Sequence, residues 1–81
     1  MSKRKKLYER ILNMPKDLRY EELTKALEDC GYQLNRTTGS HSIFTKSGCN
    51  PLTIPCKTPV KSYLIEQVLK EIGDCLENML D

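Results

Sequence analysis

The stretch at residues 31–44, GYQLNRTTGSHSIF, constrains the fold more than any other part of the 81-residue chain. Residues 32–34 alternate apolar and polar side chains, as a strand with one buried face does. Turn-forming residues follow at 36–39, and a β-branched and aromatic run completes the stretch. The pattern predicts a β-hairpin with Gly39 in its turn and His41 at the start of the second strand.

Alternation along the second strand does not decide which of its faces is buried. His41 shares a face with Ile43 and Thr45, whereas Phe44 lies on the opposite face with Ser42. Both faces carry an apolar residue, so the pattern leaves open which face packs on the core.

Two segments before the hairpin show the helical spacing of apolar residues. Residues 2–13 predict a short amphipathic helix that Pro15 closes, because proline biases the preceding residue away from helical geometry. Residues 18–29 predict a second helix, and Gly31 directly after it suits a left-handed C-cap. The outward positions of this second helix are acidic.

A third strand and a long helix follow the hairpin. Residues 52–54 predict a short strand after a segment dense in turn-forming residues. The next helix has two candidate N-caps, which are Thr58 with Pro59 at the first helical position, or Ser62. Sequence alone does not choose between them.

The final helix, from about Lys61, carries the widest apolar stripe in the chain. Gly73 lies within it and costs about 1 kcal/mol relative to alanine. Asp74 followed by Glu77 forms a capping-box pattern that can start a new helix. We therefore expect a kink or a two-part helix at Gly73.

These elements predict one α+β domain, with a three-stranded antiparallel sheet packed against helices. Residues 1–15 form an added N-terminal helix, residues 18–72 the core of the domain, and residues 73–81 a helical tail. No apolar run is long enough to span a bilayer, and no signal-peptide core is present. We expect a cytoplasmic protein without membrane contact that is a monomer when free.

The four cysteines do not form a recognisable ligand pattern. No pair has the two-residue separation of a zinc knuckle or a redox site. We expect Cys30 and Cys75 to pack in the core as small hydrophobes. Cys49 and Cys56 could face each other across strand ends, and a metal site shared with His41 is a weaker alternative. We predict no metal and no cofactor.

Charge is distributed unevenly along the chain, although the net charge is only +2. No acidic residue occurs between Asp29 and Glu66. The same window contains the cationic or titratable residues Arg36, His41, Lys46, Lys57 and Lys61. This excess suits a polyanion such as RNA, because phosphate contacts dominate nucleic-acid affinity. The alternative is a solvated basic face that has no partner.

An ordered set of short motifs resembles the HicA family of bacterial toxins. The motifs are Gly31-Tyr32, Arg36, Gly39-Ser40-His41, Phe44 and Ile54-Pro55, followed by the last helix. The resemblance covers roughly residues 20–72. It implies a fold like the double-stranded-RNA-binding domain, endonuclease activity on mRNA and restraint by a HicB antitoxin. One departure is Lys57, which stands where the family often has a second histidine.

A ribonuclease of this kind needs few catalytic groups, because RNA supplies its own 2′-hydroxyl as the nucleophile. His41 fits the general base, since an unperturbed imidazole titrates near neutral pH. Cations and backbone N–H groups can stabilise the phosphorane charge. The predicted RNA-binding residues are Arg36, Gly39, Ser40, Lys46 and Lys57. With no carboxylate in the hairpin window, we expect cleavage without magnesium. The general acid is unassigned.

Two other function classes fit the same residues. A non-catalytic module of the double-stranded-RNA-binding type would need the cations but no poised base. A small interaction protein would use the basic face to meet an acidic partner. In either class, His41 would be an ordinary surface residue of a turn.

Overall fold

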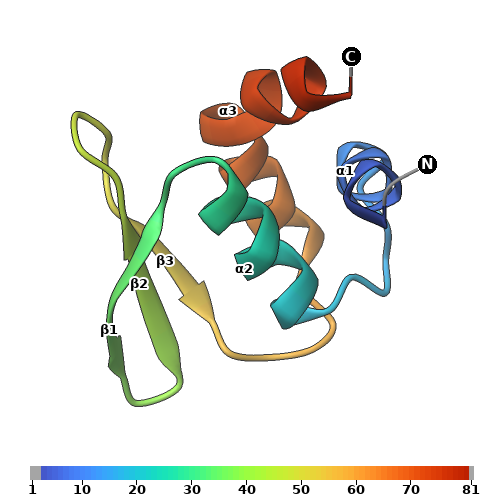
Figure 1. The fold of residues 1–81 in the computed structure, drawn as a ribbon. Helices are drawn as coiled ribbons and strands as arrows, with labels where there is room; N and C mark the ends of the chain where they lie inside the picture. Colours follow the sequence, from blue (N-terminus) through green and yellow to red (C-terminus); the bar gives the residue numbers. More distant parts are fainter. Residues whose placement is uncertain (1–2, 81) are drawn as a thin grey trace.

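The computed structural model describes residues 3–80 and confirms an α+β fold (Figure 1). In this part of the chain the three helices are α1 (Lys3–Leu12), α2 (Tyr20–Asp29) and α3 (Ser62–Met79). The three strands are β1 (Gln33–Thr38), β2 (His41–Thr45) and β3 (Leu52–Pro55). They form one antiparallel sheet in the order β1-β2-β3. Ser2, included in the predicted first helix, lies outside the described residues.

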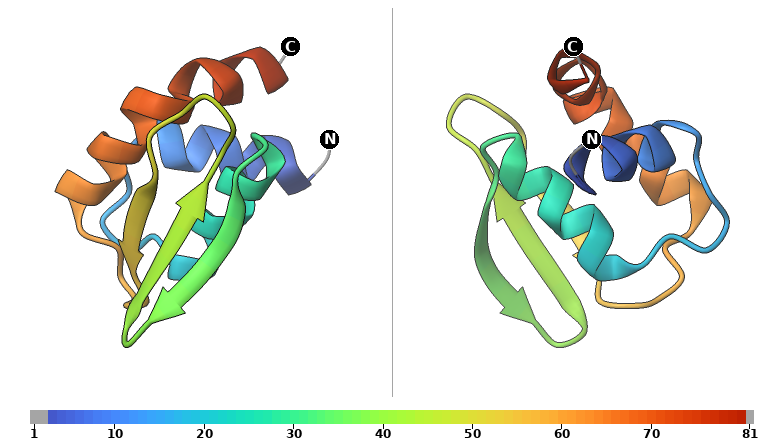
Figure 2. Two further views of the ribbon diagram at one scale, coloured as in Figure 1. Left: turned by 90° about the vertical axis from the view of Figure 1, so that its left-hand side faces the viewer. Right: turned by 45° about the vertical axis from the view of Figure 1, so that its right-hand side comes forward.

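The helices cover one face of the sheet, and α1 lies on the far side of α2 and α3 from the strands (Figures 1 and 2). On β2, Ser42 and Phe44 are buried, whereas His41 is exposed. The face of Phe44 therefore packs on the helices, which answers the question that strand parity left open. The buried apolar core draws on all three helices, the turn after α2, β2 and β3. Its members are Tyr8, Ile11, Leu18, Leu23, Ala26, Leu27, Cys30, Tyr32, Phe44, Leu52, Ile54, Val60, Leu64, Ile65, Val68, Ile72 and Leu76.

Polar contacts attach α1 to the rest of the domain. Tyr8 donates its hydroxyl to the Asp29 carboxylate at 2.6 Å. The Arg10 guanidinium pairs with Glu22 at 3.1 Å and with Asp17 at 2.9 Å. The Arg10 side chain is 35% exposed and the Asp17 side chain 81%, so screening by solvent makes these ion pairs weak. Burial of Tyr8 and Ile11 holds this helix more strongly than the ion pairs do.

The end of α2 follows the sequence prediction closely. Gly31 has a φ of +94°, which is the left-handed conformation expected of it. The N–H of Gly31 donates to the carbonyl of Glu28, and the N–H of Tyr32 donates to that of Leu27. These two bonds form a Schellman motif, which turns the chain from α2 into the sheet.

Both predicted caps of α3 are wrong. The N-cap residue is Lys61, and its side chain makes no capping hydrogen bond. Thr58 instead accepts a hydrogen bond from the backbone N–H of Tyr20 at 3.2 Å, so it serves the start of α2. That helix begins at Tyr20, two residues later than predicted, because Arg19 is its extended N-cap. Thr58 does not cap α3 because that helix begins at Ser62, four residues further along the chain.

Of the two alternatives predicted at Gly73, the two-part helix is wrong, whereas Figure 1 shows that α3 bends along its length, as a kinked helix does. α3 is a single helix from Ser62 to Met79, and Gly73 lies within it. Ile72 and Leu76 are buried on either side of Gly73. Packing of this continuous stripe outweighs the propensity cost of one glycine, which is about 1 kcal/mol.

The cysteines divide between core and surface. Cys30 is buried as predicted, whereas Cys75 is only partly buried against the core. Cys49 and Cys56 are exposed, and all four thiols are free. Within residues 3–80, no group of three or more His, Cys, Asp or Glu side chains is arranged to hold a metal ion. None of the helices that the structure describes is long and apolar enough to cross a membrane.

Candidate functional site

The hairpin turn presents His41 to solvent at the end of the sheet. β1 continues through Thr38, so the turn is shorter than expected and consists of Gly39 and Ser40. Gly39 has a φ of +59° at the first turn position, where a type II′ hairpin favours glycine. His41 pairs with Thr38 on one side and with Pro55 on the other. The central strand therefore fixes its backbone while the side chain stays accessible.

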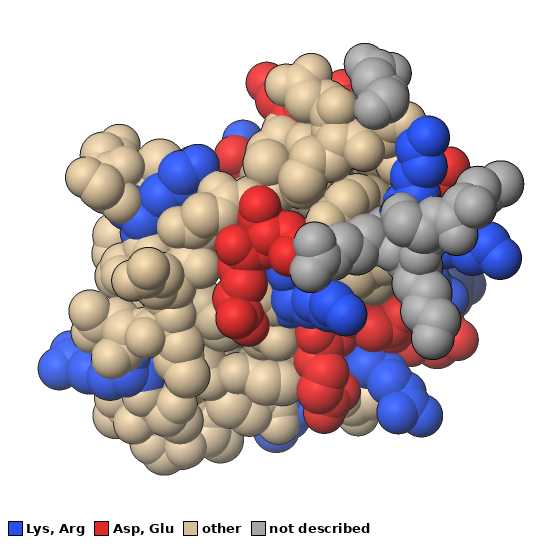
Figure 3. Space-filling view, in the orientation of Figure 1, with Lys and Arg blue, Asp and Glu red and all other residues tan. Residues whose placement is uncertain are grey.

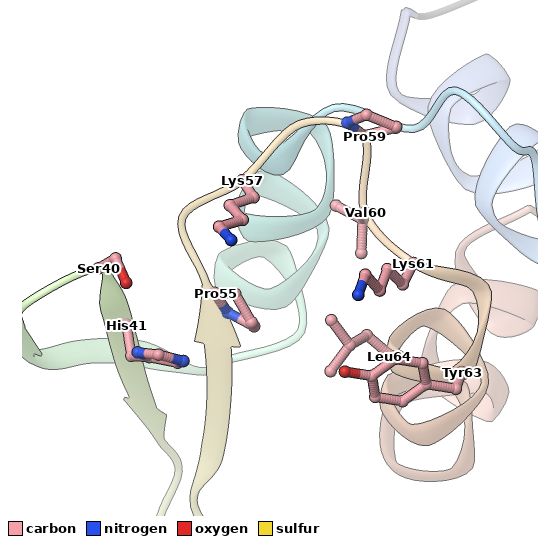
Figure 4. Close-up of a pocket in the computed structure, with 9 residues that line it drawn as sticks. All are labelled: Ser40, His41, Pro55, Lys57, Pro59, Val60, Lys61, Tyr63 and Leu64. Carbon is pink, nitrogen blue, oxygen red and sulfur yellow. The ribbon is translucent and has the colours of Figure 1, made fainter.

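A cavity of about 230 Å³ lies between His41 and the start of α3 (Figure 4). Its lining comes from the hairpin, the end of β3, the connecting loop and the first turn of α3. The lining residues are Ser40, His41, Pro55, Lys57, Pro59, Val60, Lys61, Tyr63 and Leu64. In Figure 4 the amino groups of Lys57 and Lys61 point toward the space that His41 faces. No acidic residue lines this cavity.

The structure brings together some of the predicted site residues. Ser40, His41 and Lys57 line the cavity, and Gly39 forms the turn directly beside them. The carbonyl of Ser40 accepts a 2.7 Å hydrogen bond from the N–H of Cys56, which ties the turn to the loop that carries Lys57. The turn that precedes His41 and the loop that carries Lys57 are therefore joined, and both side chains line one cavity.

A bulge in β1 places Arg36 on the outer face of the sheet, which is also the face of His41. The register of β1 against β2 shifts between Leu34 and Arg36, so Asn35 is an extra residue. Leu34 pairs with Phe44 on the helix side, whereas Arg36 pairs with Ile43 on the outer side. Without the bulge, simple alternation would place Arg36 on the side of Leu34. Arg36 does not line the cavity.

Lys46 lies away from these residues. It follows β2 at the end opposite His41, and five residues of strand separate the two by about 17 Å. Its amino group lies 5.8 Å from the ring centroid of Tyr32, over the turn that ends α2. Figure 3 shows Lys and Arg, but no Asp or Glu, over the sheet on the left, whereas acidic side chains lie over the helices. The cations of the window are therefore spread over the sheet rather than gathered in one cluster.

A comparison with models of known protein families identifies the family of this chain. A family model described as the HicA toxin of bacterial toxin–antitoxin systems matches residues 20–73. This segment runs from the first residue of α2 into α3 and contains every residue that lines the cavity. The chain belongs to the HicA toxin family. Searches of curated proteins and of solved structures give no match.

Family membership makes this HicA protein the toxin of a toxin–antitoxin system, with an antitoxin as its partner. The family is known for RNA cleavage, which supports a nuclease in general terms. α1 lies outside the matched segment and packs on the face of α2 and α3 away from the sheet.

A partly buried polar network lies behind the cavity of this HicA protein. The hydroxyls of Tyr20 and Ser42 share a hydrogen bond at 2.5 Å, and the Ser42 hydroxyl lies 3.0 Å from the Cys56 thiol. Ser42 is 2% exposed and follows His41, while Cys56 precedes Lys57. Burial raises the pKa of the Tyr20 phenol, so Tyr20 stays neutral and can donate. The network joins α2 to the two strands that carry the site.

Sequence reasoning assigned no site role to two polar residues that line the cavity, Lys61 and Tyr63. Lys61 was counted among the cations of the window, but its role at the cavity follows only from its position as the N-cap of α3. No acidic residue occupies the first turn of α3, so the positive end of the helix dipole adds to the field of Lys57 and Lys61. Tyr63 was not singled out at all. Its signal is an aromatic residue just outside the apolar stripe, within the acid-free window.

Proposed function

We propose that this HicA toxin is an endoribonuclease that cleaves mRNA without a metal ion, with His41 as the general base. The observation that carries the proposal is the cavity in which an exposed histidine faces two lysines and no acid. His41 is the only histidine of the chain, and histidine is the side chain that most often serves as a general base.

The reaction requires few groups. The imidazole of His41 takes the proton of the 2′-hydroxyl, and the 2′-oxygen then attacks the adjacent phosphorus. The 5′-oxygen leaves with a proton from solvent, which gives a 2′,3′-cyclic phosphate and a 5′-hydroxyl. Lys57 and Lys61 stabilise the charge on the phosphorane oxygens, and the Ser40 hydroxyl donates a hydrogen bond. Arg36 binds a flanking phosphate on the outer face of the sheet.

Lys57 changes the family's arrangement at one position. The ammonium group of a lysine supplies a point charge and three hydrogen-bond donors but no acceptor. It can hold a phosphate oxygen but cannot replace the base. His41 therefore carries the proton abstraction alone.

The decisive experiment compares the parent with His41→Ala in an RNA cleavage assay. Removing a general base lowers the rate about 10²- to 10⁴-fold. The thermal midpoint should change little, because His41 is exposed and such substitutions cost under about 0.5 kcal/mol. Cleavage by the variant at the parental rate would exclude His41 as the base. A parent that binds RNA without cutting it would instead favour the non-catalytic RNA-binding module.

A second measurement tests the role of metals. We expect cleavage in excess EDTA and products that end in 2′,3′-cyclic phosphate, because the 2′-oxygen and the lysines replace a metal-bound nucleophile and its charge. The cavity is lined by no carboxylate that could bind magnesium. Loss of activity on chelation, restored by magnesium, would contradict this mechanism.

We further propose that the antitoxin is a small, net-acidic HicB-like protein that covers the hairpin and occludes His41. The acid-free surface of the sheet favours a partner with carboxylates, which would compete with phosphate and gain association rate from steering. Because Lys46 and Lys57 lie at opposite ends of the strands, Lys46→Glu and Lys57→Glu test two parts of this surface separately. Lys57→Glu should weaken both antitoxin and RNA binding. Weakened RNA binding with unchanged antitoxin affinity for both variants would place the inhibitor elsewhere.

A further inference from the structure

A second, shallower cavity continues the His41 cavity across the start of α3. It measures about 460 Å³ and is lined by Lys16, Pro59, Val60, Lys61, Ser62 and Tyr63. Four of these residues, at positions 59, 60, 61 and 63, also line the His41 cavity. The two hollows therefore adjoin at these residues, and we call them together the groove, which extends from the hairpin over the first turn of α3 to the loop between α1 and α2.

Tyr63 lies where the two hollows meet. Its side chain is 61% exposed, although its neighbours Leu64 and Ile65 are buried in the core. In Figure 4 its ring lies at the mouth of the cavity with the hydroxyl directed inward. A single exposed aromatic residue is ordinary on a protein surface. This one, however, lines both halves of a groove that also contains the proposed base.

Charge along the groove has one sign. Lys57 lines only the His41 hollow, Lys16 lines only the second hollow, and Lys61 lines both. All three lysines are exposed, and no acidic residue lines either hollow. A strand that lies across Tyr63 therefore meets cations both before and after the ring.

We propose that this groove binds single-stranded RNA, with one base stacked on Tyr63 and the strand continuing from His41 to Lys16. The inference rests on the proposed nuclease function and specifies its substrate. Proteins that bind single strands combine a cationic groove with aromatic rings on which unpaired bases stack. Bases in a duplex are already stacked, and duplex readers use 2′-hydroxyl and phosphate contacts that require no exposed ring. The exposed tyrosine in the groove therefore selects an unpaired strand.

The test measures RNA binding in the His41→Ala background, so that binding does not depend on cleavage. Fluorescence anisotropy would compare a labelled single-stranded oligonucleotide with a blunt hairpin duplex. Tyr63→Ala should weaken single-strand binding about 5- to 150-fold, the loss expected for one base–aromatic stack. Tyr63→Phe keeps the ring and should retain parental affinity. Affinity for the duplex should be the same for all three proteins.

Lys16 provides an independent test of the path that the RNA strand takes along the groove. Lys16→Gln should reduce the slope of log K against log salt by about 0.7 for a long single strand, the loss of one phosphate contact. Lys25, exposed on α2 outside the groove, is the matched control, and Lys25→Gln should leave the slope unchanged. The thermal midpoint of each variant reports whether it is folded.

The outcomes separate this inference from the nuclease proposal. Unchanged single-strand affinity in folded Tyr63→Ala, or tighter binding of the duplex than of the single strand, would overturn the stacking site even if His41 is essential for cleavage. Tyr63-dependent binding by a parent that does not cut RNA would support the groove and refute the nuclease. A slope that falls equally for Lys16→Gln and Lys25→Gln would overturn the proposed path.

Discussion

Ser42 offers the sharpest test of how the fold holds the site. Its hydroxyl bonds to Tyr20 on α2 and to Cys56 after β3, and the residue is 2% exposed. Ser42→Ala removes one buried oxygen and no carbon, so it creates almost no cavity. Its effect therefore measures the polar network itself. The size of the stability loss depends on whether Tyr20 and Cys56 find other hydrogen-bond partners.

The two partners are not equally affected by the substitution. Cys56 is exposed, so water can replace the lost contact to its thiol. The Tyr20 phenol is partly buried, and leaving such a donor unsatisfied costs about 1–3 kcal/mol. Because some water can reach this hydroxyl, we expect the lower half of that range, about 1–2 kcal/mol. For a domain of this size, each kcal/mol lowers the thermal midpoint by about 4–8 °C.

A double-mutant cycle separates the network from the single losses. Tyr20→Phe leaves Ser42 with only the Cys56 thiol and should cost about 1 kcal/mol. The double variant removes both hydroxyls, so its loss should be smaller than the sum by about 1 kcal/mol. Urea unfolding followed by circular dichroism gives all three free energies. Ser47→Ala, at an exposed serine, should change stability by less than about 0.5 kcal/mol and serves as the control.

Two results would refute this reasoning. Additive losses in the cycle would mean that Tyr20 and Ser42 do not interact energetically. A Ser42→Ala protein as stable as the Ser47→Ala control would mean that water satisfies the phenol, and that the network does not hold α2 against the strands.

Two other predictions concern the turn at the end of α2 and the thiol beside it. Gly31→Ala should cost about 1–2 kcal/mol, because a side chain at φ +94° is strained. The Cβ added at Gly31 would lie 3.3 Å from the Lys46 side chain, which is flexible and can move aside. The Cβ added at Gly48, where φ is +80°, would meet no atom within 4 Å. Gly48→Ala should therefore cost a similar amount. A much larger loss of thermal midpoint for Gly31→Ala would show that Lys46 is held rigidly. Burial raises the pKa of the Cys30 thiol from its ordinary value of 9.0 to about 12. The unfolded chain therefore loses this proton at a lower pH than the folded protein, and stability should fall as the pH rises from about 9 through 12. The thermal midpoint of Cys30→Ala should fall less steeply over this range. An identical fall would assign the effect to other groups.

Local chemistry explains why much of the fold was predictable from sequence. Gly31 ends α2 because only the residues next to it are needed to form the Schellman motif. Gly39 marks the hairpin turn for a similar reason, since turn type depends on a few backbone angles. His41 was placed correctly at the start of β2, because its distance from the turn is fixed by the chain.

Long-range contacts explain what the sequence could not show. Thr58 accepts a hydrogen bond from Tyr20, which lies 38 residues earlier. The residues next to Thr58 in the sequence therefore do not reveal that it serves the start of α2 and not the start of α3. The groove requires Lys16 and Tyr63 to meet across the start of α3, which only packing of the helices brings about. Lys46 falls outside the cavity because β2 continues straight to Thr45 and carries it away from His41.

The bulge in β1 bears on the prediction that the free toxin is a monomer. β1 lies at the edge of the sheet, and all six of its residues are exposed. A regular edge strand is a template for pairing with another chain, and bulges are one device that prevents such pairing. Asn35 supplies that irregularity here. Deleting Asn35 would leave Leu34 opposite Phe44 and Arg36 opposite Ile43, so the facing of each side chain would be kept while the ladder became regular.

We therefore expect the Asn35 deletion to stay folded but to self-associate. Analytical ultracentrifugation across a concentration series should show a monomer for the parent and a growing dimer or larger species for the deletion. Asn35→Ala keeps the extra residue and should remain monomeric, which separates the backbone effect from the loss of a polar side chain. If the parent already dimerises, the edge is an interface and not a protected strand. If the deletion stays monomeric at high concentration, the polar residues of β1 alone are sufficient to keep the edge unpaired.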